Sequence, residues 1–358
     1  MPGPPPATAA VRLAVRRCLA DLPPDALVAA AVSGGADSLA LAAALAFERP
    51  GAVALVVDHG LQDGSAEVAA RAADQCRALG LTAEVLPAPP ATSAHPDAPP
   101  TVTERTLRLA AEEAAATSAH PDPDRTASER TLREGGRGGG GPEGRARDSR
   151  YAALGTATDR LGAAAVLLGH TLDDQAETVL LGLARGAGAR SLAGMPAARG
   201  LLRRPLLGVT RAQTRQACVE AGLTPWDDPH NGEPAFARVR VRATVLPVLE
   251  EQLGPGVAQA LVRSARQLRE DADALDALAD EVLAGPQADT LAVLGALAPA
   301  VLSRVLKRWG ESRSGRALSA AHVDGLRSLV EDWHGQGPVD LPGGGRVTRQ
   351  EGRLAFEA

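Results

Sequence analysis

Six consecutive residues near the N-terminus have the composition of a phosphate-binding loop. They are Ser33, Gly34, Gly35, Ala36, Asp37 and Ser38, between an apolar run and a helical pattern. Glycines let the backbone approach a phosphate closely, and amide groups at the start of a following helix point at it. Ser33 and Ser38 add hydroxyl donors, whereas Asp37 is predicted to hold a Mg²⁺ that bridges phosphates. A plain strand-to-helix turn with Asp37 as the N-cap is the alternative.

A second group of polar residues follows a later apolar run. Gly169 and His170 leave that run, and Asp173, Asp174 and Glu177 come where the next helical pattern begins. At these spacings Glu177 shares a helix face with both aspartates. A histidine with clustered carboxylates indicates metal binding, with Asp174 beside Asp37, and handling of protons from an incoming amine. The alternative is a capped helix with an acidic first turn, with Asp173 as the N-cap or first residue.

A third polar segment, Asp58-His59-Gly60-Leu61, follows the second apolar run. In a doubly wound sheet the carboxyl ends of the strands line the ligand crevice. Asp58 and His59 are therefore predicted to contact a bound nucleotide, and a small turn with a capping aspartate is the alternative.

These groups need strands that end at one edge of a sheet. Short apolar runs alternate with helical patterns, which indicates an α/β fold: a parallel, doubly wound sheet with helices on both faces. The predicted strands are 26–32, 53–57, 82–86 and 165–168, and the predicted helices are 11–20, 39–47, 65–79, 143–160 and 173–185.

Beyond residue 205 helical patterns dominate. Residues 257–283 form a long amphipathic pattern, and 292–358 show helices followed by two short strand-like runs around Pro342-Gly343-Gly344. We predict a catalytic domain at 1–235, a helical linker at 236–285 and a small C-terminal module at 286–358.

The segment 89–141 differs from its surroundings. It is rich in Pro, Ala, Thr, Ser and Gly, and it repeats itself imperfectly, with 92–97 recurring as 117–122. Two polar copies are too few for a solenoid, so we predict a disordered surface insertion. The G-x-G-x-x-G match at 136–141 follows no strand and reflects composition only.

Composition excludes several chemistries. The chain holds one lysine, Lys307, in a context with no preceding glycines, which rules out a Walker A loop. The formal net charge is −5, so nucleic acid would have to meet a local arginine patch. Three cysteines without a C-x-x-C pair favour free thiols. No apolar run of about 18 residues and no signal peptide is present, so we expect no membrane partner and a cytoplasmic location.

The six-residue loop resembles the PP-loop of enzymes that split ATP into AMP and pyrophosphate. Other segments resemble the tRNA(Ile)-lysidine synthase family: 169–195, 204–207, 226–231, 236–242, and 143–151 with Arg147, Arg150 and Tyr151. The resemblance covers about 28–87 and 141–253 well and the C-terminal module weakly. Two features depart from the family pattern: His230 stands where serine is usual, and the 89–141 insertion is longer than the usual connection.

The resemblance implies a ligase that uses ATP and Mg²⁺ and acts on the isoleucine tRNA with a CAU anticodon. ATP would adenylate the C2 oxygen of the wobble cytidine, and free L-lysine would displace AMP to form lysidine. Arg147 or Arg150 would face the α-phosphate. His170 with the Asp173/Asp174 pair would orient or deprotonate the lysine. The C-terminal module would bind tRNA, and the protein would be a monomer or homodimer.

The surface that would meet tRNA is less defined. Two arginine groups are candidates, and solvated surface arginines are the alternative for each. Trp226 and Tyr151 are the candidates for stacking on bases, with a core position as their alternative. The arginine groups are Arg238, Arg240 and Arg242, and Arg199, Arg203 and Arg204.

Three other functions compete with this interpretation. A PP-loop enzyme that thiolates tRNA generally uses paired cysteines, which this chain lacks. An amidotransferase-type synthetase needs a glutaminase module or partner, and no such module is visible. A nucleotide-binding protein without catalysis would not need the set Asp37, His170 and Asp174.

Overall fold

The computed structural model describes residues 3–58, 60, 64–87, 142–228 and 235–357, with only the backbone described for 142–148. His59, the predicted insertion 89–141 and His230 lie outside the described residues, as does the side chain of Arg147. The chain divides into two compact units, Met1–Ala265 and Arg266–Ala358.

The first unit is built on a six-stranded sheet with the order β3-β2-β1-β4-β6-β5. All neighbouring pairs are parallel except β5 with β6. The four predicted strands are confirmed within two residues at each end, whereas β5 and β6 were not predicted. The strands are β1 (Val28–Val32), β2 (Val53–Asp58), β3 (Thr82–Pro87), β4 (Ala165–Leu167), β5 (Ala198–Arg199) and β6 (Leu202–Arg203).

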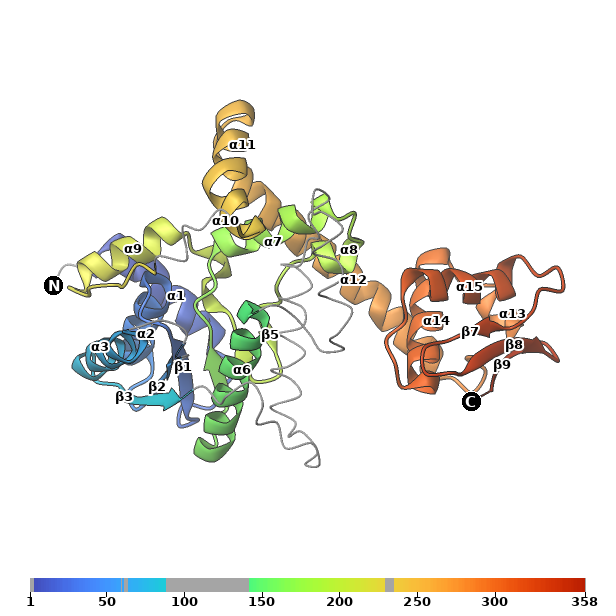
Figure 1. The fold of residues 1–358 in the computed structure, drawn as a ribbon, viewed down its shortest axis with the longest axis horizontal. Helices are drawn as coiled ribbons and strands as arrows, with labels where there is room; N and C mark the ends of the chain where they lie inside the picture. The colour runs from blue at the N-terminus through green and yellow to red at the C-terminus, as the bar shows by residue number, and fades with distance from the viewer. Residues whose placement is uncertain (1–2, 59, 61–63, 88–141, 229–234, 358) are drawn as a thin grey trace, which may run out of the picture. The chain divides into compact units, whose positions relative to one another are not determined.

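Side chains of β1 alternate between two cores, one on each face of the sheet. Val28, Ala30 and Val32 pack with α1, α2, α3 and α9, whereas Ala29 packs with Leu154 of α6. The predicted doubly wound α/β architecture is therefore confirmed, and Figure 1 shows α6 apart from α1, α2 and α3. These helices are α1 (Pro6–Cys18), α2 (Ala36–Glu48), α3 (Ser65–Ala78), α6 (Pro142–Leu161) and α9 (Arg211–Glu220).

A separate helical group packs beside the sheet. Ala176 and Leu181 contact Val241 and Leu246, so α7 is covered by the turns that follow residue 236. One of these turns, η4, is a short π-helix, a rare element that occurs often at functional sites. The group comprises α7 (Leu172–Ala184), α8 (Ala189–Leu192), α10 (Ala237–Arg240), η4 (Val241–Val245), α11 (Leu246–Leu253) and the first part of α12 (Val257–Ala284). The short helix η2 (Pro205–Gly208) instead packs Leu206 into the core with α1 and α2.

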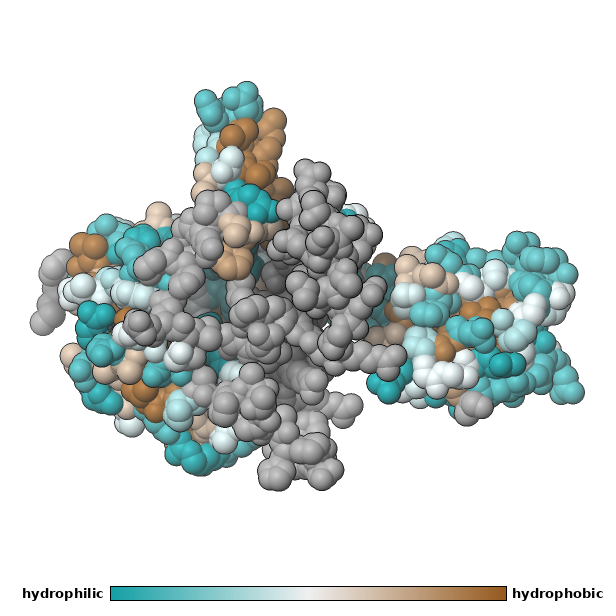
Figure 2. Space-filling view, viewed as in Figure 1, coloured by the Kyte–Doolittle hydropathy of each residue, from teal (hydrophilic) through white to brown (hydrophobic). Residues whose placement is uncertain are grey.

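One face of α11 is apolar and uncovered. Val248 and Leu253 are 49% and 73% exposed, and Figure 2 shows the hydrophobic side of this helix. No helix of the described residues is long and apolar enough to cross a membrane.

The second unit packs two helices and the last part of α12 against an antiparallel sheet with the order β7-β8-β9. Leu302, Leu306, Trp309 and Leu326 form its core with Val347. The two predicted strand-like runs correspond to β7 and β8, and β9 was missed. The elements are α13 (Leu291–Leu294), α14 (Pro299–Ser314), α15 (Ala320–Glu331), β7 (Val339–Asp340), β8 (Arg346–Gln350) and β9 (Arg353–Glu357).

The three cysteines are free, as the sequence favours. Cys76 and Cys218 are buried, and burial raises the pKa of each thiol to about 11. Both are therefore protonated and unreactive at neutral pH.

Candidate active site

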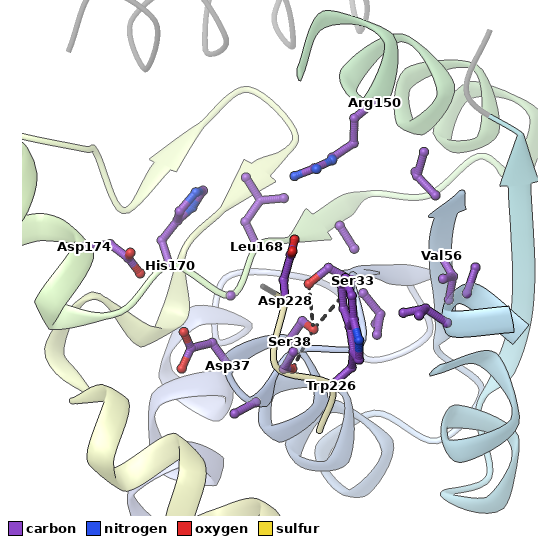
Figure 3. Close-up of a pocket in the computed structure, with 18 of the residues that line it drawn as sticks. Ser33, Asp37, Ser38, Val56, Arg150, Leu168, His170, Asp174, Trp226 and Asp228 are labelled. Atoms are coloured by element: carbon purple, nitrogen blue, oxygen red, sulfur yellow. Dashed lines mark hydrogen bonds between the residues drawn. The ribbon is translucent and has the colours of Figure 1, made fainter. Parts of the chain in front are cut away.

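The glycine loop is held in shape by Ser38. The amide of Ser33 donates to Ser38 Oγ at 3.1 Å, and that hydroxyl lies 2.9 Å from the carbonyl oxygen of Gly35 (Figure 3). Gly34 has a φ of +85°, and a Cβ added there would lie 3.3 Å from the Cβ of Ala72. The loop therefore requires glycine at this position both for its backbone angle and for its contact with α3.

The start of α2 faces the cavity without a side-chain cap. Gly35 is the N-cap, and within the described part of the chain no side-chain cap hydrogen bond is made to the first turn of the helix. The alternative prediction, that Asp37 caps this helix, is wrong because Asp37 lies inside its first turn. The Asp37 carboxylate instead accepts from the hydroxyl of Thr214 and lies 3.6 Å from Arg211 Nε. The first amides of α2 are thus available to an anion.

A cavity of about 680 Å³ opens at the carboxyl ends of the strands. It brings together most of the predicted site residues, although Gly34 and Asp173 do not line it. Figure 3 shows Asp37, His170 and Asp174 on one side and Trp226 with Val56 on the other. The predicted residues that line the cavity are Ser33, Gly35, Ala36, Asp37, Ser38, Asp58, Arg150, Gly169, His170 and Asp174.

Gly169 lets β4 leave the sheet directly against the glycine loop. A Cβ at this residue would lie 3.1 Å from the carbonyl carbon of Asp37 and 3.1 Å from the amide nitrogen of Ser38. Because both are backbone atoms, they have little freedom to move aside.

We expect Gly169→Ala to displace the start of α2 from β4. The free energy of unfolding should fall by about 1–3 kcal/mol, and kcat/KM for ATP should fall about tenfold or more because the loop is misplaced. Denaturant titration and steady-state kinetics measure the two effects. Gly208→Ala is the control, because a Cβ there meets nothing within 4 Å. Equal behaviour of the two variants would show that the close approach has no role.

The start of α7 differs from the prediction. Thr171, and not Asp173, is the N-cap: its amide donates to Asp174 Oδ2 at 2.8 Å in a capping box. Asp173 instead accepts the backbone amide of Arg211 at 2.7 Å, which fixes the first turn of α9 to α7. Asp174 therefore both takes part in the capping box and lines the cavity.

Three arginines that the sequence did not place in the site surround Glu177. This carboxylate is fully buried, and it lies 3.4 Å from Arg211 Nη1, 3.1 Å from Arg238 Nε and 2.8 Å from Arg242 Nε. Arg211 also reaches Asp174, with its Nη2 2.9 Å from Oδ1. Together these residues form what we call the arginine–carboxylate cluster: Asp37, Asp174, Glu177, Arg211, Arg238 and Arg242.

Comparisons with known proteins show the family of this chain. A model of the PP-loop domain matches residues 128–249, and a model of the TilS substrate binding domain matches 290–355. A tRNA(Ile)-lysidine synthase of Leifsonia xyli is 49% identical over 94% of this chain and 91% of its own length. One from Salinispora arenicola is 47% identical over 98% and 96%, and one from Thermobifida fusca is 46% identical over the full length of both.

The chain belongs to the tRNA(Ile)-lysidine synthase family. Its fold is also similar to a solved structure, the U34-tRNA thiolase NcsA from Methanococcus maripaludis with its [4Fe-4S] cluster. That match has a TM-score of 0.51 at 17% identity and covers 74% of this chain and 80% of the thiolase, which supports the fold alone.

In this lysidine synthase family member, the pKa values of two aspartates of the site are shifted in opposite directions. Burial raises the pKa of Asp37, and the nearby charge of Asp174 adds to the rise, against the Thr214 hydroxyl and Arg211. Burial also acts to raise the pKa of Asp174, but Arg211, His170 and Arg238 outweigh it and the pKa is lowered. Asp174 is therefore a stable anion, whereas the positive charge near Asp37 is too small to offset the effect of its burial.

Of the two arginine groups predicted as a tRNA-binding surface, several members are not exposed. The stretch with Arg238, Arg240 and Arg242 is helical, so Arg238 and Arg242 share one side and line the cavity, while Arg240 is exposed. Of the second group, Arg204 is 4% exposed and donates to the carbonyl oxygen of Pro196, and Arg203 pairs with Asp21 at 2.6 Å. Neither group forms one continuous basic face.

Both aromatic candidates for base stacking line the cavity. Tyr151 is 8% exposed and packs in the core on one face of the sheet, which agrees with the alternative of a core position. Trp226 lies above the glycine loop, where its amide donates to the carbonyl oxygen of Gly34 at 2.9 Å. Gln75 holds Thr224, two residues before Trp226, through two hydrogen bonds. The segment after α9 therefore covers the loop.

Proposed function

We propose that this chain joins free L-lysine to the wobble cytidine of the isoleucine tRNA with a CAU anticodon. ATP adenylates the C2 oxygen of the base and pyrophosphate leaves. The lysine amine then attacks C2, loses a proton and displaces AMP, which leaves lysidine. The observation that supports this best is that the PP-loop, His170 and Asp174 line the same cavity. Membership of the lysidine synthase family supports it independently.

ATP fits the cavity with its phosphates on the PP-loop. The uncapped first turn of α2 offers amides, and Ser33 offers a hydroxyl near them, whereas the Ser38 hydroxyl donates to the carbonyl oxygen of Gly35. The adenine then lies on the apolar side of the cavity, against Val56, Val57 and Val68. Asp58 lines that side too, at the end of β2, where the ribose would be within reach.

Magnesium fits Asp37 better than Asp174. The described residues hold no group of three or more metal-ligating side chains, so a cation would depend on phosphate oxygens for most of its ligands. This is how Mg²⁺ is usually bound beside triphosphates, where it neutralises developing charge. Arg211 lies 3.6 Å from Asp37 but only 2.9 Å from Asp174, which also accepts the amide of Thr171. We propose Asp37 as the principal ligand and Asp174 as a second ligand through Oδ1.

The amine step uses the charged side of the cavity. A lysine ammonium group is attracted by Asp174, whose lowered pKa keeps it anionic. His170 faces the same space and is proposed to accept the proton that the amine loses on attack (Figure 3). Asp173 contributes by holding the backbone of Arg211 and not by contact with lysine.

Arg150 is proposed to neutralise the α-phosphate. It lines the cavity on α6, across from His170 in Figure 3. Arg150→Met should lower kcat/KM for ATP about 10- to 100-fold, because a charged hydrogen bond to the reacting phosphate is lost. Pyrophosphate release measures this. Arg160→Met is the control on the same helix, because Arg160 pairs with Glu84 at 2.5 Å outside the cavity lining. An unaffected Arg150→Met would leave this role to Arg147.

The three predicted regions of the chain are proposed to have different roles. Residues 1–235 supply the ATP site, and the helical linker 236–285 adds Arg238 and Arg242 to the cavity. The module 286–358 contains the match to a substrate binding domain and is proposed to bind the tRNA. We propose that the protein is cytoplasmic and is a monomer or a homodimer. Sedimentation of the purified protein distinguishes the two oligomeric states.

Labelled lysine tests the proposed function directly. The protein is incubated with the isoleucine tRNA transcript, ATP, Mg²⁺ and labelled lysine, and the tRNA is digested to nucleosides. We expect one label on the wobble cytidine per AMP and pyrophosphate released. A methionine tRNA transcript, which also carries CAU, is the specificity control. Pyrophosphate release without lysine on the base would contradict the proposal.

A further inference from the structure

Arg211 occupies the centre of the arginine–carboxylate cluster. It is the first residue of α9, and its side chain is 19% exposed. Its guanidinium faces three carboxylates at once: Asp174 at 2.9 Å, Glu177 at 3.4 Å and Asp37 at 3.6 Å. The three contacts together keep its pKa raised in spite of burial, so Arg211 is a permanent cation in this position.

The three contacts of Arg211 are not equivalent. Glu177 has two further arginines, and Asp174 has Arg242 at 3.8 Å. Among the ion pairs of the described residues, Asp37 has Arg211 alone. That contact is also the longest of the three and beyond good hydrogen-bond distance. Arg211 can therefore give up Asp37 and stay anchored on Asp174 and Glu177.

We propose that Arg211 is the resident counter-ion of Asp37 and makes magnesium binding conditional on ATP. This rests on the proposed function, in which Asp37 holds Mg²⁺. A free Mg²⁺ that approaches Asp37 meets a guanidinium already in place, and the two cations repel each other. When Mg²⁺ arrives with ATP, the triphosphate supplies the negative charge that offsets this repulsion. Arg211 then remains on Asp174 and Glu177 as a positioning residue.

Magnesium titration of the nucleotide-free full chain tests this inference. Calorimetry and thermal melting are run with Mg²⁺ alone on the wild type, Arg211→Gln and Arg215→Gln. Arg215 lies on the same helix and lines the cavity but pairs with Asp227. We expect Arg211→Gln to bind Mg²⁺ at least about tenfold more tightly than the wild type, with a higher Tm in Mg²⁺. Arg215→Gln should match the wild type.

Two further variants identify the ligand and protect against loss of fold. Asp37→Asn combined with Arg211→Gln should lose the gain in Mg²⁺ affinity. Arg211→Lys keeps the charge but lacks the fork that reaches three carboxylates, so it should also bind Mg²⁺ more tightly than the wild type. If circular dichroism shows Arg211→Gln to be unfolded, the Mg²⁺ affinity of Arg211→Lys is compared with that of the wild type instead. Unchanged Mg²⁺ affinity in the folded variant overturns the inference, as does a gain that survives Asp37→Asn.

This outcome is independent of the ligase assay, since the titration contains neither tRNA nor lysine. Wild-type lysine incorporation with unchanged Mg²⁺ binding in Arg211→Gln contradicts the Arg211 inference alone. Failure of lysine incorporation with the expected Mg²⁺ gain contradicts the proposed reaction alone.

Discussion

Asp37→Asn is expected to lower kcat for ATP-dependent ligation by about 10²- to 10³-fold. Asparagine keeps the shape of the side chain and still accepts the hydroxyl of Thr214. It removes the negative charge that we propose for Mg²⁺. The loss should therefore appear in kcat measured at saturating Mg²⁺ and ATP.

The same variant should be more stable than the wild type. Because burial raises the pKa of Asp37 above its ordinary value of 3.8, the folded state binds a proton more tightly than the unfolded state. The Asp37 carboxyl therefore adds to the free energy of unfolding at low pH. This contribution is lost as the pH rises from 3.8 through the raised pKa of the folded state. At neutral pH the charge costs stability, so its removal should raise the free energy of unfolding.

Asp21→Asn is the matched control for this prediction. Asp21 pairs with Arg203 and is 64% exposed, and it does not line the cavity. Its kcat should stay within about twofold of the wild type, as for most surface substitutions. A folded Asp37→Asn enzyme with wild-type turnover would remove Asp37 from the mechanism.

Glu177→Gln is expected to lower the free energy of unfolding by about 3–5 kcal/mol. The carboxylate is fully buried and faces Arg211, Arg238 and Arg242. Its neutralisation leaves these cations close together with less compensating charge, and a partly buried guanidinium cannot neutralise itself by losing a proton. Denaturant titration of the full chain, followed by a probe in the first unit, measures the change.

Glu84→Gln is the control with the same chemical change. Glu84 also pairs with an arginine, Arg160, but the two side chains are 37% and 54% exposed. Exposed pairs of this kind contribute less than about 1 kcal/mol. Similar small losses in both variants would show that Glu177 is not the anchor of the cluster. Ligase activity of Glu177→Gln should fall with the stability, because Arg238 and Arg242 line the cavity.

The sequence predicted those parts of the fold that depend on local patterns. Strands β1 and β4 and all but the last residue of β2 are continuous apolar runs, and the glycine loop is a short motif between a strand and a helix. Strands β5 and β6 have two residues each, too few for any period to be visible. The capping role of Thr171 had a signal that was overlooked, since Thr171 and Asp174 have the spacing of a capping box.

The arginine–carboxylate cluster could not be predicted in the same way. Glu177 meets Arg211 and Arg242 across 34 and 65 residues of sequence, and no local pattern encodes such contacts. The available signal was Glu177 itself, a charged residue on a helix whose other buried residues are uncharged. A buried carboxylate requires cationic partners, but the sequence does not say which of its many arginines they are.

The order in which the cavity residues occur along the chain has a consequence for biosynthesis. The walls are drawn from β1 and β2, then from β4 and α7, and finally from α9 and η4. During translation, Glu177 leaves the ribosome before Arg211, Arg238 and Arg242 exist to compensate it. A nascent chain that ends before Arg211 therefore carries a carboxylate that cannot be desolvated favourably, and the lining of the cavity is complete only after Arg242 has been made.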